Sequence, residues 1–91
     1  MREKMMQIAD HYGYGGQSRQ LIEEMAELTV AINKKWRDDT VGTESIIEEI
    51  ADVEIMLEQI KYLLGCDWEV FKTKLTKVDR QIARIKDEYT M

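Results

Sequence analysis

The chain contains no proline, and only one cysteine, one histidine and five glycines occur among its 91 residues. Because proline and glycine most often interrupt helices, their scarcity favours a few long helices joined by short turns. The single cysteine, Cys66, excludes a disulfide within the chain. Together with the single histidine, His11, it leaves too few sulfur and nitrogen ligands for a typical zinc centre. Any metal site must therefore be built from oxygen ligands.

Long apolar runs and excess positive charge are missing as well. No apolar run approaches the roughly 18 to 20 residues that a membrane span requires, and residues 1–4 lack the apolar region of a secretory signal. The net charge of -5 argues against a nucleic-acid duplex or an anionic membrane as the partner. We therefore expect a cytoplasmic protein with no membrane partner and no nucleic-acid partner.

What the chain does have is apolar residues at helical spacing. They make up 44% of the sequence, and the length suits a single domain over residues 1–91. Gly13 and Gly65 are placed to end helices, and Tyr14 to Gln17 are expected to form a turn. The sequence thus predicts an all-α fold, a compact four-helix domain. Its helices are expected over residues 2–12, 18–36, about 43–64 and 67–89.

The last predicted helix carries apolar residues at alternating spacings of three and four, which is the seam of a coiled coil. The seam consists of Trp68, Phe71, Leu75, Val78, Ile82, Ile85 and Tyr89. Such a seam packs against another helix, either in its own chain or in a second copy. The preceding helix is also apolar around much of its circumference. We therefore expect a homodimer or a homotetramer.

Two pairs of carboxylates occur on neighbouring predicted helices: Glu24 with Glu27, and Glu49 with Asp52. A spacing of three residues places both members of a pair on one helix face. At about 100° per residue, Glu49 falls inside the apolar face of its helix and Glu24 borders another. An ionised carboxylate in apolar surroundings costs several kcal/mol unless it is paired, hydrogen-bonded or bound to a metal. The pattern therefore indicates a divalent-metal site between two helices, and oxygen ligands favour Mg²⁺, with Mn²⁺ as the alternative.

The segments Leu21–Leu28 and Glu48–Val53 resemble the EExxE…ExxD pattern of MazG-like nucleotide pyrophosphohydrolases, members of the all-α NTP pyrophosphatase superfamily. The resemblance covers residues 8–64 well and the last helix more loosely. It implies a MazG-like bundle completed by homo-oligomerisation. It also implies that a nucleoside triphosphate is hydrolysed between its α and β phosphates, giving a monophosphate and pyrophosphate. The Mg²⁺ ligands that it implies are Glu24, Glu27, Glu49 and Asp52.

The resemblance and the charges also nominate residues for the catalytic base and for substrate binding. A carboxylate that is not fully engaged by metal can accept the proton of the attacking water, and Glu27 and Glu49 remain alternatives for this role. Substrate-binding candidates are Gln17, Asn33, Lys34, Trp36 and Lys74. The competing interpretation of Lys74 is a solvated helix surface, and that of Trp36 is a core or interface aromatic. The preferred base and sugar stay open.

Two other functions fit the same sequence. The seam of the last helix could serve a non-catalytic protein-interaction module, in which case Mg²⁺ would leave the thermal stability unchanged. Alternatively, the chain could bind nucleotides and sense them without turnover.

Overall fold

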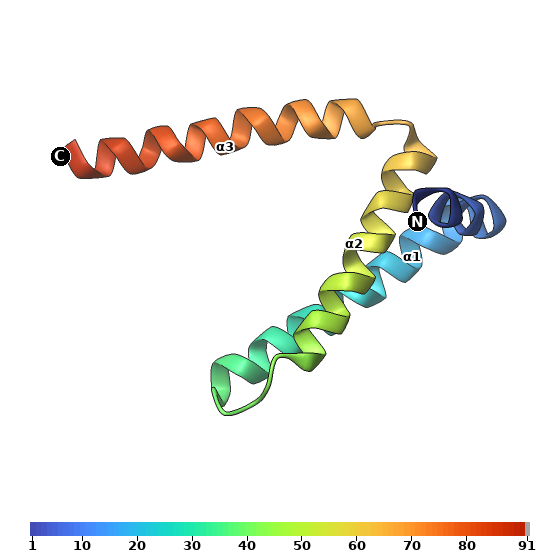
Figure 1. The fold of residues 1–91 in the computed structure, drawn as a ribbon, viewed down its shortest axis with the longest axis horizontal. Coiled ribbons are helices and arrows are strands. Elements are labelled where there is room, and N and C mark those ends of the chain that lie inside the picture. The colour runs from blue at the N-terminus through green and yellow to red at the C-terminus, as the bar shows by residue number, and fades with distance from the viewer. Residues whose placement is uncertain (91) are drawn as a thin grey trace.

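The computed structural model describes residues 1–90, which form three helices and no strand (Figure 1). The helices are α1 (Arg2–Arg37), α2 (Glu44–Leu64) and α3 (Asp67–Thr90). The all-α prediction is confirmed. The predicted count of four helices is not confirmed, because the first two predicted helices form one helix with a kink.

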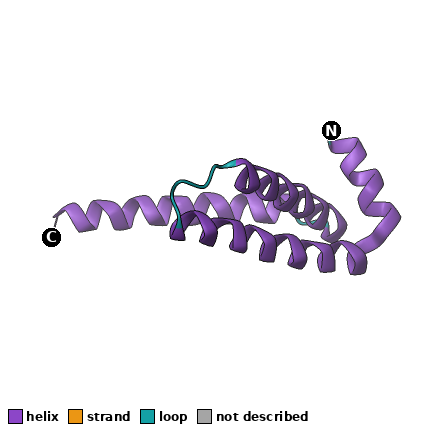
Figure 2. Cartoon of the chain, turned by 90° about the horizontal axis from the view of Figure 1, so that it is seen from below, coloured by secondary structure: helices purple, strands orange, loops and turns teal. Residues whose placement is uncertain are grey.

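The kink in α1 lies at Gly13, whose backbone has φ 76° and ψ 173°. This region of backbone space is open almost only to glycine, since a Cβ atom would clash there. Helix resumes directly at Tyr14, so the predicted turn from Tyr14 to Gln17 is wrong. A single glycine conformation is enough to redirect the chain, and the N-terminal segment leaves the line of the rest of α1 (Figure 2).

The N-terminal segment of α1, residues 2–12, is held by side-chain contacts to the carboxyl-terminal end of α2 and the start of α3. Tyr62 donates its hydroxyl hydrogen to Asp10, with 2.8 Å from Oη to Oδ1. The guanidinium of Arg2 lies 3.7 Å from Glu58 and 3.3 Å from Asp67. Ala9, in the same segment, is fully buried. The kink therefore folds residues 2–12 back onto the carboxyl-terminal half of α2.

Residues 14–37 of α1 pair with α2 as a helical hairpin, and nearly all of the interhelical packing is between α1 and α2. Its small core contains Ala31, Val53 and Met56. The connecting loop is ordered by Asp38, whose Oδ1 accepts hydrogen bonds from Thr40 N at 3.0 Å and from Thr40 Oγ1 at 2.6 Å. These two bonds hold the pKa of Asp38 below its ordinary value. The hairpin fixes how α1 and α2 side chains face one another.

The end of α2 lies at Gly65, as the sequence predicts. Gly65 adopts the left-handed conformation, with φ 62° and ψ 36°. Its N–H donates to the carbonyl of Tyr62 at 3.1 Å, and the N–H of Cys66 donates to the carbonyl of Lys61 at 3.0 Å. This pair of bonds is the Schellman motif, which satisfies the last carbonyls of a helix. The motif turns the chain sharply before α3 begins.

Helix α3 projects away from the hairpin, and no residue of Asp67–Thr90 is buried (Figure 1). The radius of gyration is 16.8 Å, against about 12 Å for a compact domain of this length. One copy of the chain is therefore less compact than the sequence predicts. Across residues 1–90, no helix combines the length and the apolar character that a bilayer crossing requires.

Candidate metal centre

Three carboxylates from the two hairpin helices meet at one point. Glu24 of α1 and Glu49 and Asp52 of α2 each offer one oxygen, and these three oxygens lie within 4.8 Å of one another. Glu49 and Asp52 share one face of α2, as their spacing of three predicts. The structure thus brings together three of the four predicted ligands, and we call this group the carboxylate cluster.

Two oxygens of the carboxylate cluster lack a hydrogen-bond donor. Oε2 of Glu24 and Oε2 of Glu49 are buried, and neither accepts a hydrogen bond from residues 1–90. The other oxygen of Glu24 is engaged, since Gln20 Nε2 donates to it at 2.8 Å. Buried polar atoms are almost always paired in folded proteins, so unpaired carboxylate oxygens call for a positively charged partner.

The electrostatics of the carboxylate cluster also favour a positively charged partner. Desolvation raises the pKa of Glu49, and the negative charge of Glu27 raises it further. Desolvation also raises the pKa of Asp52, and the negative charge of Glu24 raises it further. Like charges held this close disfavour ionisation. A bound cation would relieve this repulsion and return the carboxylates to their charged form.

Glu27, the fourth predicted ligand, lies beside the carboxylate cluster rather than within it. It is exposed, and its negative charge raises the pKa of the nearby Glu49. It also lines a cavity of about 350 Å³ between the two helices and their connecting loop. Glu27 therefore lies between the carboxylate cluster and this cavity.

The cavity beside Glu27 has a mostly apolar wall and a few polar groups. Lys34 contributes a positive charge, and Glu49 belongs to both the cavity and the carboxylate cluster. The volume lies at the lower end of the range typical of small-molecule sites. Its lining residues are Ala26, Glu27, Val30, Ala31, Lys34, Val41, Gly42, Ser45, Ile46 and Glu49.

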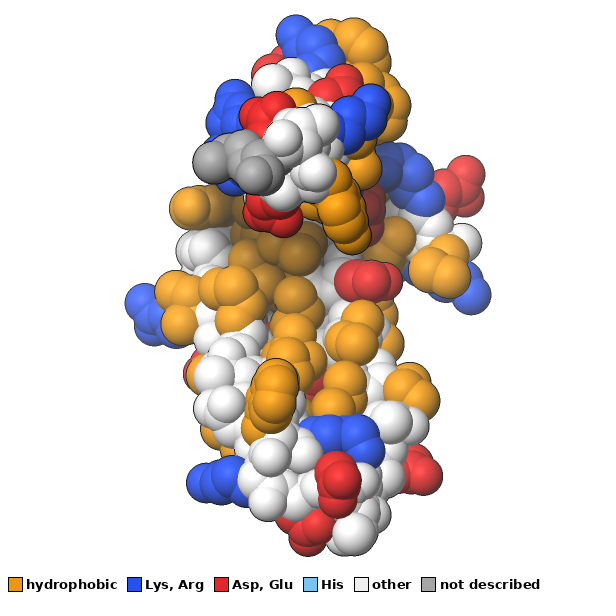
Figure 3. Space-filling view, turned by 90° about the vertical axis from the view of Figure 1, so that its left-hand side faces the viewer, with side chains coloured by type: hydrophobic (Ala, Val, Ile, Leu, Met, Phe, Trp, Pro, Cys, Tyr) orange, Lys and Arg blue, Asp and Glu red, His pale blue; other side chains and the backbone are white. Residues whose placement is uncertain are grey.

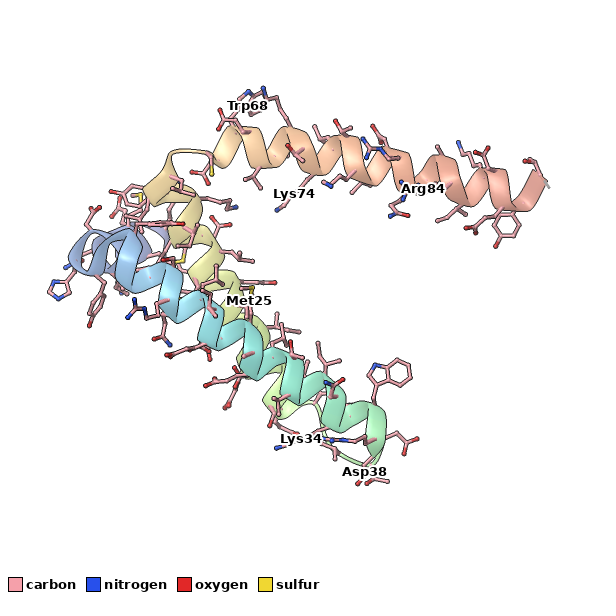
Figure 4. All side chains as sticks on the ribbon, turned by 180° about the vertical axis from the view of Figure 1, so that it is seen from behind. Met25, Lys34, Asp38, Trp68, Lys74 and Arg84 are labelled. Carbon is pink, nitrogen blue, oxygen red and sulfur yellow. The ribbon has the colours of Figure 1, made fainter. Side chains whose placement is uncertain are left out.

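The other predicted substrate-binding residues do not join Lys34 in the cavity. Gln17 is buried and donates its amide hydrogen to Gln59 instead of facing open space. Asn33 is exposed, and Trp36, 83% exposed, lines a separate depression. Lys74 lies on α3, where it lines a cleft with residues of α2 at the elbow between the two helices (Figure 4).

Two residues that the sequence did not single out either contact a predicted site residue or line the cavity. Gln59 is the buried partner of Gln17, and it follows Asp52 by seven residues, which places both on one face of α2. Ser45 lines the cavity and precedes Glu49 by four residues, again on one face. The spacing from the predicted ligands was the signal that could have identified both.

Comparisons with family models, curated proteins and solved structures find no match to this chain. The resemblance to MazG-like pyrophosphohydrolases therefore rests on the residues of the two carboxylate segments.

Proposed function

We propose that the chain is a Mg²⁺-dependent nucleoside triphosphate pyrophosphohydrolase, which converts a nucleoside triphosphate and water to the monophosphate and pyrophosphate. The supporting observation is the pair of buried, unpaired oxygens on Glu24 and Glu49 within a cluster of three carboxylates. The substrate class comes from the resemblance of the two carboxylate segments to MazG-like enzymes.

The carboxylate cluster suits Mg²⁺ by its donor atoms. Glu24, Glu49 and Asp52 offer only oxygen, and Mg²⁺ prefers a few carboxylates completed by water and substrate phosphates. When bound, Mg²⁺ would neutralise phosphate charge, lower the pKa of water and orient it for in-line attack. Mn²⁺ has the same ligand preference and remains the alternative cation.

Glu27 is the better candidate for the general base. It lies outside the group of oxygens that converge within 4.8 Å, whereas Glu49 belongs to that group. A carboxylate left free of metal keeps a lone pair for the proton of the attacking water. Glu27 also lines the cavity in which we place the nucleotide. Because Glu49 lines this cavity as well as belonging to the carboxylate cluster, Glu27 lies at the border between the metal ligands and the substrate.

Lys34 and the apolar wall of the cavity provide the substrate contacts of this proposal. The ammonium group of Lys34 would offset phosphate charge, since it lines the same cavity as Glu27 and Glu49. Val30, Val41 and Ile46 offer apolar surface to the nucleoside. Gln17, which is engaged with Gln59, positions the helices rather than the substrate.

The proposed enzyme acts as a homodimer or homotetramer in the cytoplasm. Oligomerisation is supported by α3, which buries no side chain of Asp67–Thr90 against its own chain.

Incubation of the purified protein with a panel of ribo- and deoxyribonucleoside triphosphates and Mg²⁺ tests the proposal. We expect a monophosphate and pyrophosphate from at least one member. Glu49→Gln should reduce the rate by at least about 100-fold, as is typical for groups that act at the reacting atoms. The matched control is Glu48→Gln, which removes a charge from an exposed neighbour and should stay active.

The alternatives give different results in the same experiment. An absence of product with every nucleotide contradicts the proposal. Nucleotide binding without product indicates a sensor. A melting temperature that Mg²⁺ does not change, together with no nucleotide binding, indicates an interaction module, because a metal bound only by the native state must raise it.

A further inference from the structure

A buried hydrogen bond between two glutamine side chains joins α1 to α2. Gln17 donates its amide hydrogen to the side-chain carbonyl of Gln59. The two residues are 6% and 2% exposed, less than the apolar core residues Ala31, Val53 and Met56 at 7 to 8%. A hydrogen bond this deep adds little net stability, because both amides lose their contacts with water. The pair therefore calls for a reason other than stability.

The glutamine pair lies in register with the carboxylate cluster. Gln17 precedes Glu24 by seven residues on α1, and Gln59 follows Asp52 by seven residues on α2. The two helices run antiparallel (Figure 1). Seven residues make about two helical turns. The contact of Gln17 with Gln59 and the approach of Glu24 to Asp52 therefore require the same relative position of the helices along their axes.

A third pair of side chains requires that position as well. Glu27 follows Glu24 by three residues on α1, and Glu49 precedes Asp52 by three residues on α2. Glu27 and Glu49 lie close enough for the charge of one to act on the other. The glutamine pair and both carboxylate pairs thus share a single register of the hairpin.

The apolar packing of the hairpin does not select this register by itself. Leu21 and Leu28 lie on the face of α1 that carries Gln17, and Val53, Met56 and Ile60 lie on the facing side of α2. Hydrophobic side chains also run in rows down the hairpin (Figure 3). Because apolar residues recur at every turn, a slip of one turn again places apolar side chains against one another.

The carboxylate cluster does not tolerate such a slip. One turn moves a helix by about 5 Å along its neighbour. The three oxygens of the carboxylate cluster lie within 4.8 Å of one another, and Mg²⁺ requires ligands at about 2.1 Å in near-octahedral geometry. After the slip, Glu24 would lie opposite Glu48 or Met56 instead of Asp52. The metal centre therefore forms in one register only.

The glutamine pair penalises the slipped registers. A shift of one turn sets Gln17 opposite Ile55 or Leu63, and Gln59 loses its donor. Each slipped register thus leaves two amides without a partner inside the hairpin, and an unpaired buried polar group is costly. A single polar pair in an apolar helix interface fixes register in this way in coiled coils.

We propose that Gln17 and Gln59 form a register lock, which aligns Glu24 with Glu49 and Asp52 and thereby sets the affinity of the carboxylate cluster for Mg²⁺. Neither glutamine contacts the metal or the substrate, so both are positioning residues. The inference rests on the proposed Mg²⁺ site, but it does not depend on which reaction the chain catalyses.

The double variant Gln17→Met/Gln59→Met tests the lock, because methionine has nearly the shape of glutamine without its hydrogen bond. Its melting temperature in EDTA should equal or exceed that of the wild type, since both buried polar groups are removed together. Calorimetric titration with Mg²⁺ should show a dissociation constant raised at least about tenfold. The matched control is Gln81→Met on α3, an exposed residue outside the hairpin, which should change neither quantity.

Spin labels report the register directly. We place them at Glu23→Cys and Glu44→Cys, both exposed, in a chain that carries Cys66→Ser. In EDTA the wild-type pair should give one distance, and the double methionine variant should add a second distance that differs by several ångströms. Saturating Mg²⁺ should remove the second distance, because the metal binds the aligned register alone.

The outcomes separate the lock from the proposed function. A double methionine variant that binds Mg²⁺ as tightly as the wild type overturns the lock, and so does one that keeps the wild-type distance in EDTA. A wild type that binds no Mg²⁺ contradicts the proposed function, while the distances in EDTA still decide the lock.

Hydrogen exchange of the wild type keeps the proposal testable if the double methionine variant fails to fold. The side-chain amide hydrogens of Gln17 should exchange more slowly when Mg²⁺ is added, because metal binding and the glutamine bond favour the same register. Exchange of Gln17 that saturating Mg²⁺ leaves unchanged overturns the lock.

Discussion

Glu49 and Asp52 carry the clearest consequence at the scale of single residues. Their pKa values are raised in the folded chain, for Glu49 above its ordinary value of 4.5 and for Asp52 above 3.8. A carboxyl with a raised folded-state pKa favours folding when it is protonated. Its contribution to stability is therefore complete below the ordinary value and is lost as the pH rises through the raised pKa. Without metal, these two residues make the fold less stable at neutral pH than in mild acid.

Urea unfolding across a pH series in EDTA measures this effect. The free energy of unfolding of the wild type should fall as the pH rises above about 4.5, and Glu49→Gln should reduce the fall because the amide cannot ionise. Glu48→Gln, whose side chain is exposed, should follow the wild type. If Glu49→Gln and the wild type show the same pH dependence, the electrostatic description of the carboxylate cluster is wrong.

At the scale of elements, α1 depends on one glycine for its kink. Gly13→Ala forces a Cβ into a backbone conformation with φ 76° and ψ 173°, at a cost of about 1 to 3 kcal/mol. Gly15 is the matched control, since it is helical and a Cβ there would meet nothing within 4 Å among residues 1–90. Gly15→Ala should stabilise the chain by up to about 1 kcal/mol, because alanine is the better helix former.

Chemical unfolding of both glycine variants, followed by circular dichroism, measures the difference. The N-terminal segment should detach in Gly13→Ala, with loss of the hydrogen bond between Tyr62 and Asp10. That bond raises the pKa of Tyr62, so an absorbance titration of tyrosine in Gly13→Ala should show one pKa moving back toward 10. Equal stability of the two variants would contradict the kinked geometry.

For the whole molecule, the carboxylate cluster lies on α1 and α2 whereas the exposed seam lies on α3, which predicts that metal binding and association are separable. In Ile82→Glu, Mg²⁺ should still raise the melting temperature as it does in the wild type, because the carboxylate cluster belongs to α1 and α2. Differential scanning calorimetry with Mg²⁺ and with EDTA provides the comparison. Glu49→Gln should show the reverse behaviour, with association retained and the Mg²⁺ effect lost. Loss of the Mg²⁺ effect in a helical Ile82→Glu protein would mean that the partner contributes to the site.

The predictable part of the fold followed from local patterns. The ends of α2, the seam of α3 and the two carboxylate pairs each depend on residues within a few turns of one another, where helix geometry alone relates position to face. The continuity of α1 across Gly13 was not predictable in this way. A glycine-rich stretch is compatible with a turn of several residues or with one residue at positive φ, and only packing of residues 2–12 on α2 selects the second.

The candidate site was likewise predictable from the sequence only in part. The sequence by itself determined which carboxylates share a helix face, because the spacing of three residues fixes their direction. The tertiary structure decided which of them meet. The hairpin brings Glu24 to Glu49 and Asp52 and leaves Glu27 beside them. It also turns Gln17 toward Gln59, and the elbow after Gly65 carries Lys74 away from the carboxylate cluster. These outcomes depend on how α1, α2 and α3 pack, which is a property of residues far apart in the chain.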